Sequence, residues 1–182
     1  MRILGINETS HDASVSVVED GKILFAAHAE RYSKVKNDWF INTSILDEAL
    51  SFGRPDRIAY YEDRLLKKWR ILTRGGLGGG KPFYKSDPRL KDIPVYVAFH
   101  HHSHASAGYY TSPFDNALVV VLDAIGEFTT SSIWVGEGDS LRQVKRWKYP
   151  FSFGLFYSAF TDLIGLKPNE EEYIMMGMAA YG

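Results

Sequence analysis

The chain has 182 residues, of which 45% are hydrophobic and 14% aromatic, enough apolar material for a packed core. Its 21 basic and 22 acidic residues leave a net charge of −1, so no global positive field attracts nucleic acid. No apolar run of about 18 residues predicts a transmembrane helix, and the polar start after Arg2 is not typical of a signal peptide. The lack of cysteine excludes disulfides and thiolate chemistry. We expect a cytoplasmic globular protein that does not bind membranes.

The amino-terminal third has the pattern of an antiparallel meander. Short runs of apolar or alternating residues indicate strands. Asp20-Gly21 stands between two such runs and predicts a hairpin turn. A helix capped by Asn42 or Thr43 should follow, and then a further strand, because Gly53 and Pro55 end the helical pattern. The predicted strands are Arg2–Asn7, His11–Glu19, 22–31 and Arg57–Tyr61, with a helix at Thr43–Phe52.

Residues 62–92 differ in character, since they combine many basic residues with a glycine cluster at Gly75–Gly80. We interpret them as a helix followed by a mobile loop inserted into the fold. The interleaved Trp69, Phe83 and Tyr84 are compatible with RNA or phosphate contact, but a solvated insertion is the preferred interpretation. The glycine cluster lacks the residue order of a phosphate-binding loop.

The rest of the chain repeats the pattern of the amino-terminal part, in which an apolar strand is followed by a meander. This repetition suggests an α/β fold with a duplicated ribonuclease-H-like lobe. The first lobe should cover residues 1–112, with the insertion at 62–92, and an incomplete second lobe should begin at 116. The predicted strands are Val95–Phe99, Ala117–Leu122, Ser131–Gly136 and Leu141–Tyr149, and the helices are Ser103–Tyr110 and Leu155–Ile164.

The sharpest local feature is the run of histidines at residues 100–102 and 104. His100 and His104 are four residues apart, so on a helix they share one face and can chelate one metal ion. The start of a helix disfavours imidazolium and keeps the rings neutral, as metal ligands must be. The alternative is a polar, exposed helix start. His101 and His102 point elsewhere on such a helix and are weaker candidates.

Asp123 is a candidate third ligand, because it follows the apolar run that ends at Leu122. A carboxylate at the end of a buried strand lies at the edge of a sheet where ligands usually bind. Two imidazoles and a carboxylate suit Fe(II), Mn(II) or Zn(II) and leave coordination positions open. The alternative is that Asp123 only begins a turn. His11 and Asp12 form a candidate acid/base pair after the first strand, although such a pair is more often structural.

Several segments, in this order, resemble the amino-terminal part of the carbamoyltransferase family that includes nodulation and antibiotic O-carbamoyltransferases. They span nearly the whole chain, and residues 62–92 are the part that the resemblance explains least. The segments are LGINETSHDASVSVVEDGKI, AERYSKVKND, HHHSHASAGYYTSPF, LDAIGE, SFGLFYSAFTDLIGLKPNEEEY and MGMAAYG.

The resemblance implies a fold of the actin/sugar-kinase/Hsp70 class and a biosynthetic role. Members make carbamoyl-adenylate from carbamoyl phosphate and ATP in a separate domain, and then transfer the carbamoyl group to a substrate hydroxyl. His11 matches the catalytic histidine, the general base toward the hydroxyl. Lys36 and Gly154 match residues that contact the nucleotide, although a solvated strand end is the default interpretation of Lys36. The matched metal ligands are His100, His104 and Asp123, with Asp123 also next to the substrate.

The resemblance also implies that a fourth metal ligand and the adenylate-forming domain lie beyond residue 182. We therefore expect either a truncated piece of an enzyme, inactive alone, or a natural short homologue. The metal would be Fe(II) first, with Mn(II) or Zn(II) as alternatives, and the acceptor a sugar or an antibiotic-like polyol. The rival hypothesis is a non-catalytic metal-binding partner or regulatory module. A missing half-lobe would leave apolar surface exposed, which favours self-association into a homodimer.

Overall fold

A computed structural model describes residues 1–73 and 82–182. The chain divides into two compact units, Met1–Ala98 and Phe99–Gly182. The predicted lobe boundary at residues 112–116 stays a prediction. The helix His100–Tyr110, which precedes this boundary, belongs to the second unit because its contacts are with that unit.

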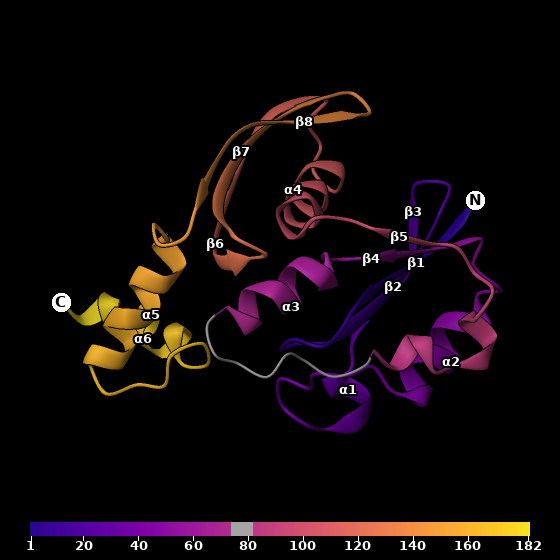
Figure 1. The fold of residues 1–182 in the computed structure, drawn as a ribbon, viewed down its shortest axis with the longest axis horizontal. Coiled ribbons are helices and arrows are strands. Elements are labelled where there is room, and N and C mark those ends of the chain that lie inside the picture. Colours follow the sequence, from indigo (N-terminus) through magenta and orange to yellow (C-terminus); the bar gives the residue numbers. More distant parts are fainter. Residues whose placement is uncertain (74–81) are drawn as a thin grey trace. The chain divides into compact units, whose positions relative to one another are not determined.

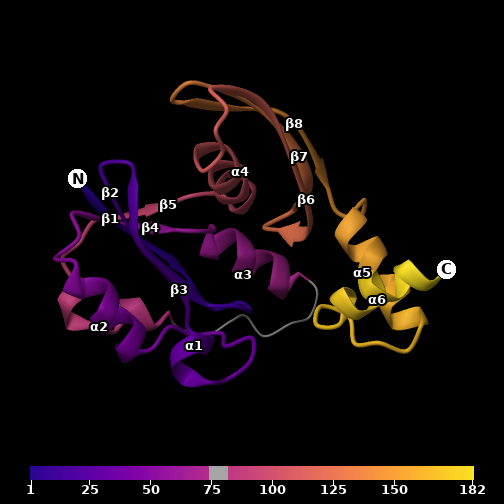
Figure 2. The same ribbon diagram turned by 180° about the vertical axis from the view of Figure 1, so that it is seen from behind.

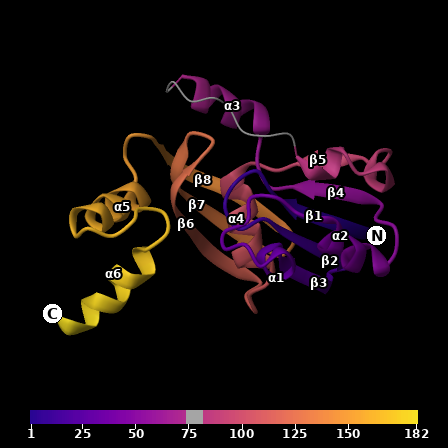
Figure 3. The same ribbon diagram turned by 90° about the horizontal axis from the view of Figure 1, so that it is seen from below.

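The first unit is built on a five-stranded mixed sheet with the strand order β3-β2-β1-β4-β5, which Figure 3 shows from below. β1, β2 and β3 are antiparallel neighbours, so the predicted meander is confirmed, but β2 begins at Ser14 and not at His11, and β3 ends at His28 and not at residue 31. β4 runs parallel to β1, and β5 runs parallel to β4. The elements are β1 (Arg2–Asn7), β2 (Ser14–Glu19), β3 (Lys22–His28), α1 (Glu30–Ser33), α2 (Thr43–Ser51), β4 (Arg57–Tyr60), α3 (Arg64–Leu72), η1 (Phe83–Lys85), η2 (Pro88–Leu90) and β5 (Val95–Val97).

The core of the first unit forms where the alternation of its strands meets the apolar face of α2. Leu4 and Ile6 of β1 are buried, as are the alternate residues of β2. The predicted cap of α2 is confirmed, since the Asn42 side chain accepts a hydrogen bond from the Ile45 amide at 3.1 Å. Buried residues of α2 pack into this core. The sheet and this helix thus hold the loops that follow β1 and β4.

The second unit is a three-stranded antiparallel sheet, in the order β6-β7-β8, with helices around it. Helix α4 lies on the concave side of this curved sheet in the two views of Figures 1 and 2. An α/β fold with a mixed sheet is therefore confirmed for the described residues. The elements are α4 (His100–Tyr110), β6 (Asn116–Gly126), β7 (Thr129–Glu137), β8 (Ser140–Lys148), α5 (Phe153–Leu163), α6 (Glu172–Met178) and η3 (Ala179–Tyr181).

Two predicted boundaries in the second unit were wrong. α4 begins at His100 and not at Ser103, because the first turn of the helix finds an acceptor elsewhere in the chain, as described below. β6 continues past Leu122 to Gly126, so Asp123 lies inside the strand and not after it. The register of β6 and β7 shifts between Leu122 and Gly126, and Asp123 occupies this irregular stretch. The short helices α1 and α6 were not predicted.

The basic segment 62–92 is only partly as expected. The predicted helix is present as α3, with the Asp63 side chain as its cap. The glycine cluster Gly75–Gly80 falls outside the described residues. The solvated interpretation holds for α3, where Trp69 is 63% exposed, but it was wrong for the residues after the cluster, since Tyr84 is buried and Phe83 packs against the core. The buried Tyr84 ring offers no open face for base stacking. Among the helices of residues 1–73 and 82–182, none is both long and apolar enough to cross a bilayer.

Candidate metal centre

Three polar side chains of the second unit converge at the start of α4. His100 and His104 lie one turn apart on α4, and their Nε2 atoms are 2.9 Å from each other. The Oδ2 atom of Asp123 on β6 lies 3.0 Å from Nε2 of His100 and 4.0 Å from Nε2 of His104. The three ligand atoms lie within 4.8 Å of one another. The structure thus brings together all three predicted metal ligands.

The charge states in this cluster suit a divalent cation. Burial alone would raise the pKa of Asp123, but the hydrogen bond and charge of His100 lower it to about 2. Desolvation, and then the neighbouring His100, lower the pKa of His104 below its ordinary value. At neutral pH the cluster holds a carboxylate beside a ring that resists protonation. This donor set fits Fe(II), Mn(II) or Zn(II).

His102 turns away from the cluster, as the helical spacing indicates, but His101 does not: its Nε2 lies 4.0 Å from Oδ2 of Asp123, although its hydrogen bonds go to other residues. Nδ1 of His101 lies 2.8 Å from the Ser132 hydroxyl, and its Nε2 lies 3.1 Å from the Thr129 carbonyl oxygen. The carbonyl can only accept, so Nε2 carries the proton and the hydroxyl donates to Nδ1. Desolvation lowers the pKa of His101 to about 4, which keeps this ring neutral. The His102 ring stacks on Trp134, with 5.3 Å between ring centroids.

Glu127 supports the site, and the sequence reasoning missed it. Its side-chain oxygens accept hydrogen bonds from the His100 amide at 3.1 and 3.2 Å, so a buried carboxylate caps α4 from 27 residues away. A negative charge at a helix start is favourable because the helix dipole is positive there. This cap explains why α4 begins at His100. The only sequence signal was an acidic residue within the LDAIGE segment.

Two glycines bring the backbone of the second unit close to the cluster. A Cβ at Gly126 would lie 2.3 to 2.6 Å from atoms of the His100 side chain. A Cβ at Gly154 would lie 2.5 Å from the Ala124 amide nitrogen and 2.7 Å from the Asp123 carbonyl carbon. Gly154 therefore allows the start of α5 to contact β6 beside Asp123. The predicted contact between Gly154 and a nucleotide stays a prediction.

The two remaining predicted site residues, His11 and Lys36, lie in the first unit. The His11 side chain is 66% exposed, and its Nδ1 is 2.8 Å from Oδ2 of Asp12. The Lys36 ammonium lies 3.1 Å from a carboxylate oxygen of Glu30. An open cavity of about 490 Å³ is lined by Asp12, Ala26, Ala27, His28, Glu30, Arg31 and Lys36. Its lining holds two cationic side chains, Arg31 and Lys36, and two carboxylates, Asp12 and Glu30, so the phosphate contact that the resemblance implies for Lys36 stays a prediction.

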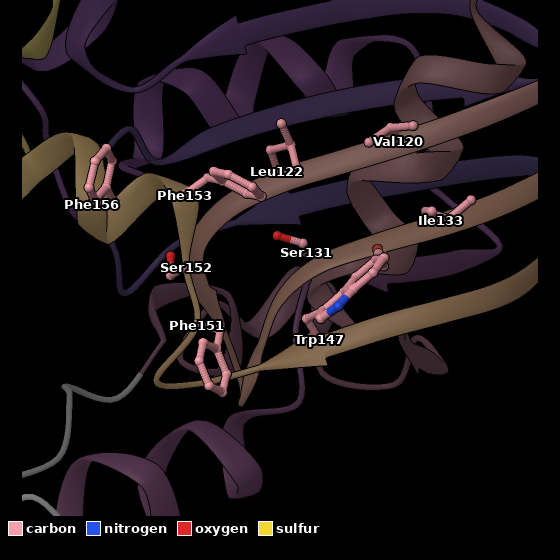
Figure 4. Close-up of a pocket in the computed structure, with 10 residues that line it drawn as sticks. Val120, Leu122, Ser131, Ile133, Trp147, Phe151, Ser152, Phe153 and Phe156 are labelled. Atoms are coloured by element: carbon pink, nitrogen blue, oxygen red, sulfur yellow. The ribbon is translucent and has the colours of Figure 1, made fainter.

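An apolar pocket of about 500 Å³ opens on the second unit (Figure 4). Figure 4 shows Val120 and Leu122 of β6 on one side and Trp147 of β8 on the other. Its serine hydroxyls are the exception in an otherwise apolar lining. The lining residues are Val120, Leu122, Ser131, Ser132, Ile133, Trp147, Phe151, Ser152, Phe153 and Phe156. Several of the lining side chains are strongly exposed, including Leu122 at 61% and Phe153 at 69%.

Comparisons with known proteins point to one family. Residues 59–182 match the sequence profile of the family described as "Carbamoyltransferase N-terminus". An uncharacterized protein of Synechocystis sp. is 34% identical over 99% of this chain and 34% of its own length. The nodulation protein NolNO of Sinorhizobium fredii is 25% identical over 97% of this chain and 28% of its own length.

A third relative carries the name of a reaction. The 3'-hydroxymethylcephem-O-carbamoyltransferase of Streptomyces clavuligerus is 25% identical over 94% of this chain and 35% of its own length. The chain therefore spans about a third of the length of these relatives. Among solved structures, a Ppx/GppA family member of Aquifex aeolicus superposes with a TM-score of 0.42 at 16% identity, over 96% of this chain and 58% of that chain.

Proposed function

Because the chain belongs to the carbamoyltransferase family, of which it matches the amino-terminal part, we propose that it is the amino-terminal portion of an ATP-dependent O-carbamoyltransferase. The enzyme would transfer a carbamoyl group from carbamoyl-adenylate to a substrate hydroxyl. The observation that carries this proposal is the convergence of His100, His104 and Asp123 within the stretch that matches the family. The whole reaction is assigned to the full-length protein.

In the proposed step, His11 acts as the general base. Its Nδ1 faces the Asp12 carboxylate, so the proton of the neutral ring sits on Nδ1 and Nε2 is left as the acceptor. As the acceptor oxygen forms its bond to the carbamoyl carbon, its proton passes to Nε2 of His11. The bond from the carbamoyl carbon to the phosphate oxygen breaks, and AMP leaves with that electron pair. The exposed ring is compatible with an acceptor that arrives from solvent.

The metal ion would be held by His100, His104 and Asp123. When bound, it would polarise the carbamoyl carbonyl or a phosphate oxygen. Asp123 belongs to an irregular part of β6, and the hydroxyl of Ser152 donates to the Asp123 carbonyl oxygen at 3.0 Å. The Ala124 amide donates to Oδ1 of Asp123 at 2.7 Å and orients the carboxylate. We propose Fe(II) as the resident ion, with Mn(II) or Zn(II) as alternatives that the same donors accept.

The donor would be made from carbamoyl phosphate and ATP in a part of the enzyme outside this chain. Lys36 would contact the phosphate from the open cavity that it lines together with Arg31, and its ion pair with Glu30 would have to rearrange for this contact. The acceptor would be a small molecule with a hydroxyl group, either a sugar or an antibiotic-like compound, and the name of the Streptomyces relative gives a hydroxymethylcephem for that protein. We also propose that the first sheet belongs to the ribonuclease-H-like lobes of the actin class, supported by its β3-β2-β1-β4-β5 order. Cytoplasmic localisation follows as part of this proposal.

The test uses the full-length protein with carbamoyl-labelled carbamoyl phosphate, ATP, Fe(II) and a panel of sugars, aminoglycosides and a hydroxymethylcephem. We expect labelled acceptor and AMP in equal amounts. His11→Gln should lower the transfer rate by about 100-fold or more, since it removes the base. His102→Gln, at a histidine whose ring stacks on Trp134 outside the metal cluster, is the matched control and should retain the rate.

Two results would contradict the proposal. If His11→Gln transfers the carbamoyl group at the wild-type rate, His11 is not the general base. Stoichiometric metal binding without transfer to any acceptor would favour a non-catalytic metal-binding partner or regulatory module.

A further inference from the structure

The loop that carries His11 has a strained backbone. It connects β1 to β2, and two of its residues, Thr9 and Asp12, have positive φ angles of 69° and 58°. A branched side chain such as that of threonine is unfavourable in this conformation. Strained residues persist only where the surrounding structure holds them, and they cluster at functional sites. The contacts that hold this loop therefore bear on the position of His11.

Backbone hydrogen bonds fix the two ends of the loop. The Thr9 amide donates to the Trp39 carbonyl oxygen at 2.7 Å, and the Ala13 amide donates to the Asp38 carbonyl oxygen at 2.8 Å. The Tyr60 hydroxyl of β4 donates to the Glu8 carbonyl oxygen at 2.9 Å. These bonds lie on either side of His11, and they leave the peptide groups between Thr9 and Asp12 to be oriented by other contacts.

Lys67 of α3 supplies one such contact. Its ammonium donates to the Thr9 carbonyl oxygen at 3.1 Å, to the Tyr61 hydroxyl at 3.1 Å, and to Oε1 of Glu62 at 2.5 Å. The three donors of the ammonium thus have three acceptors. The side chains of Lys67 and Glu62 are only 14% and 3% exposed. Tyr61 and Glu62 directly follow β4, whose parallel neighbour β1 leads into the loop.

The Thr9 carbonyl oxygen, which accepts the hydrogen bond from Lys67, is well placed to orient His11. The Thr9 carbonyl lies in the same rigid plane as the Ser10 amide, so an anchored carbonyl oxygen sets the direction in which the chain enters His11. We propose that Lys67 is a positioning residue for His11, held in its own place by Glu62. This inference rests on the proposed role of His11 as the base. The hydrogen bond from Lys67 to Thr9 keeps Nδ1 of His11 in contact with the Asp12 carboxylate, and it leaves Nε2 available to take the proton of the substrate hydroxyl.

The test reads the tautomer of His11 by long-range proton–nitrogen NMR of histidine-labelled protein near pH 8. Wild-type protein should show one tautomer, with the proton on Nδ1. Lys67→Met should give a mixture of tautomers, and Lys67→Arg, which keeps a buried cation, should restore much of the wild-type pattern. Lys68→Met, at the exposed neighbouring lysine on the same helix, should leave the tautomer unchanged.

Lys67→Met leaves the buried Glu62 without its partner and could unfold the protein, so a second variant is needed. The double variant Lys67→Met, Glu62→Leu removes both charges and should fold while still losing the single tautomer. A single wild-type tautomer in this folded double variant would overturn the inference.

The transfer rate separates this inference from the proposed function. One result supports both the positioning role of Lys67 and the role of His11 as the base. In that result Lys67→Met loses the single tautomer, and the transfer rate of the full-length protein falls about tenfold with unchanged KM for carbamoyl phosphate. If the tautomer is lost but the rate is unchanged, Lys67 positions His11 and the assignment of His11 as the base fails.

Discussion

The imidazole of His100 occupies the space that a Cβ at position 126 would fill. Atoms of the His100 side chain lie 2.3 to 2.6 Å from that position, closer than any real Cβ contact allows. Gly126 ends β6, and the next residue, Glu127, accepts the hydrogen bonds of the His100 amide. The end of β6 thus fixes the position of both the imidazole ring and the backbone amide of His100.

Gly126→Ala should therefore displace the His100 ring. We expect the affinity for Zn(II) to fall by about 10- to 100-fold, the range typical when support of a metal ligand is lost. Isothermal titration with Zn(II) measures it. Gly108→Ala is the matched control, because a Cβ on that residue of α4 would meet nothing within 4 Å. Equal Zn(II) affinities for Gly126→Ala and wild type would show that the close approach does not matter.

Buried, neutral His101 predicts a pH dependence of stability. Its pKa of about 4 in the folded protein lies below the ordinary value of 6.5, so between these values only the unfolded chain binds the proton. Stability is fully present above about pH 6.5 and is lost as the pH falls toward 4, by up to roughly 3 kcal/mol. Urea unfolding of metal-free protein at pH 7, 5.5 and 4.5 measures this loss. His101→Gln should lose correspondingly less over the same range, and identical slopes would refute the explanation.

The apolar pocket predicts self-association through the second unit. Leu118, Val120 and Leu122 of β6 are 56 to 66% exposed, which is unusual for a row of large apolar side chains. Sedimentation velocity of the 182-residue chain should show a mass that rises with concentration toward a homodimer. Leu122→Gln should weaken the association. Leu65→Gln, at an exposed leucine of α3, should not. A strictly monomeric wild-type chain would contradict this prediction.

Local patterns predicted the parts of the fold that depend on neighbours in sequence. The meander of β1 to β3 follows from alternation and the Asp20-Gly21 turn, and the start of α2 follows from Asn42. The start of α4 could not be predicted in this way, because its cap is Glu127, 27 residues later. The burial of Tyr84 likewise depends on a distant residue, since Glu8 accepts the Phe83 and Tyr84 amides at 3.0 and 3.2 Å across 75 and 76 residues.

The candidate site shows the same division between local and distant contacts. Helical spacing was enough to place His100 and His104 on one face of α4, and the apolar run before Asp123 indicated a strand beside them. The space that Gly126 leaves for His100, and the contact of Gly154 with the β6 backbone, arise only when distant segments pack. Because glycine has no side chain, its residue type does not indicate which distant segment will pack closely against it.

The most direct test of the candidate metal centre is the metal content of the purified chain after anaerobic incubation with Fe(II) or Zn(II) and removal of excess ion. We expect one ion per chain for wild type and for His102→Ala, since the His102 ring stacks on Trp134 outside the cluster. His104→Ala should lose stoichiometric binding, with unchanged circular dichroism, because one of three converging ligands is removed. A full complement of metal in folded His104→Ala would contradict the assignment.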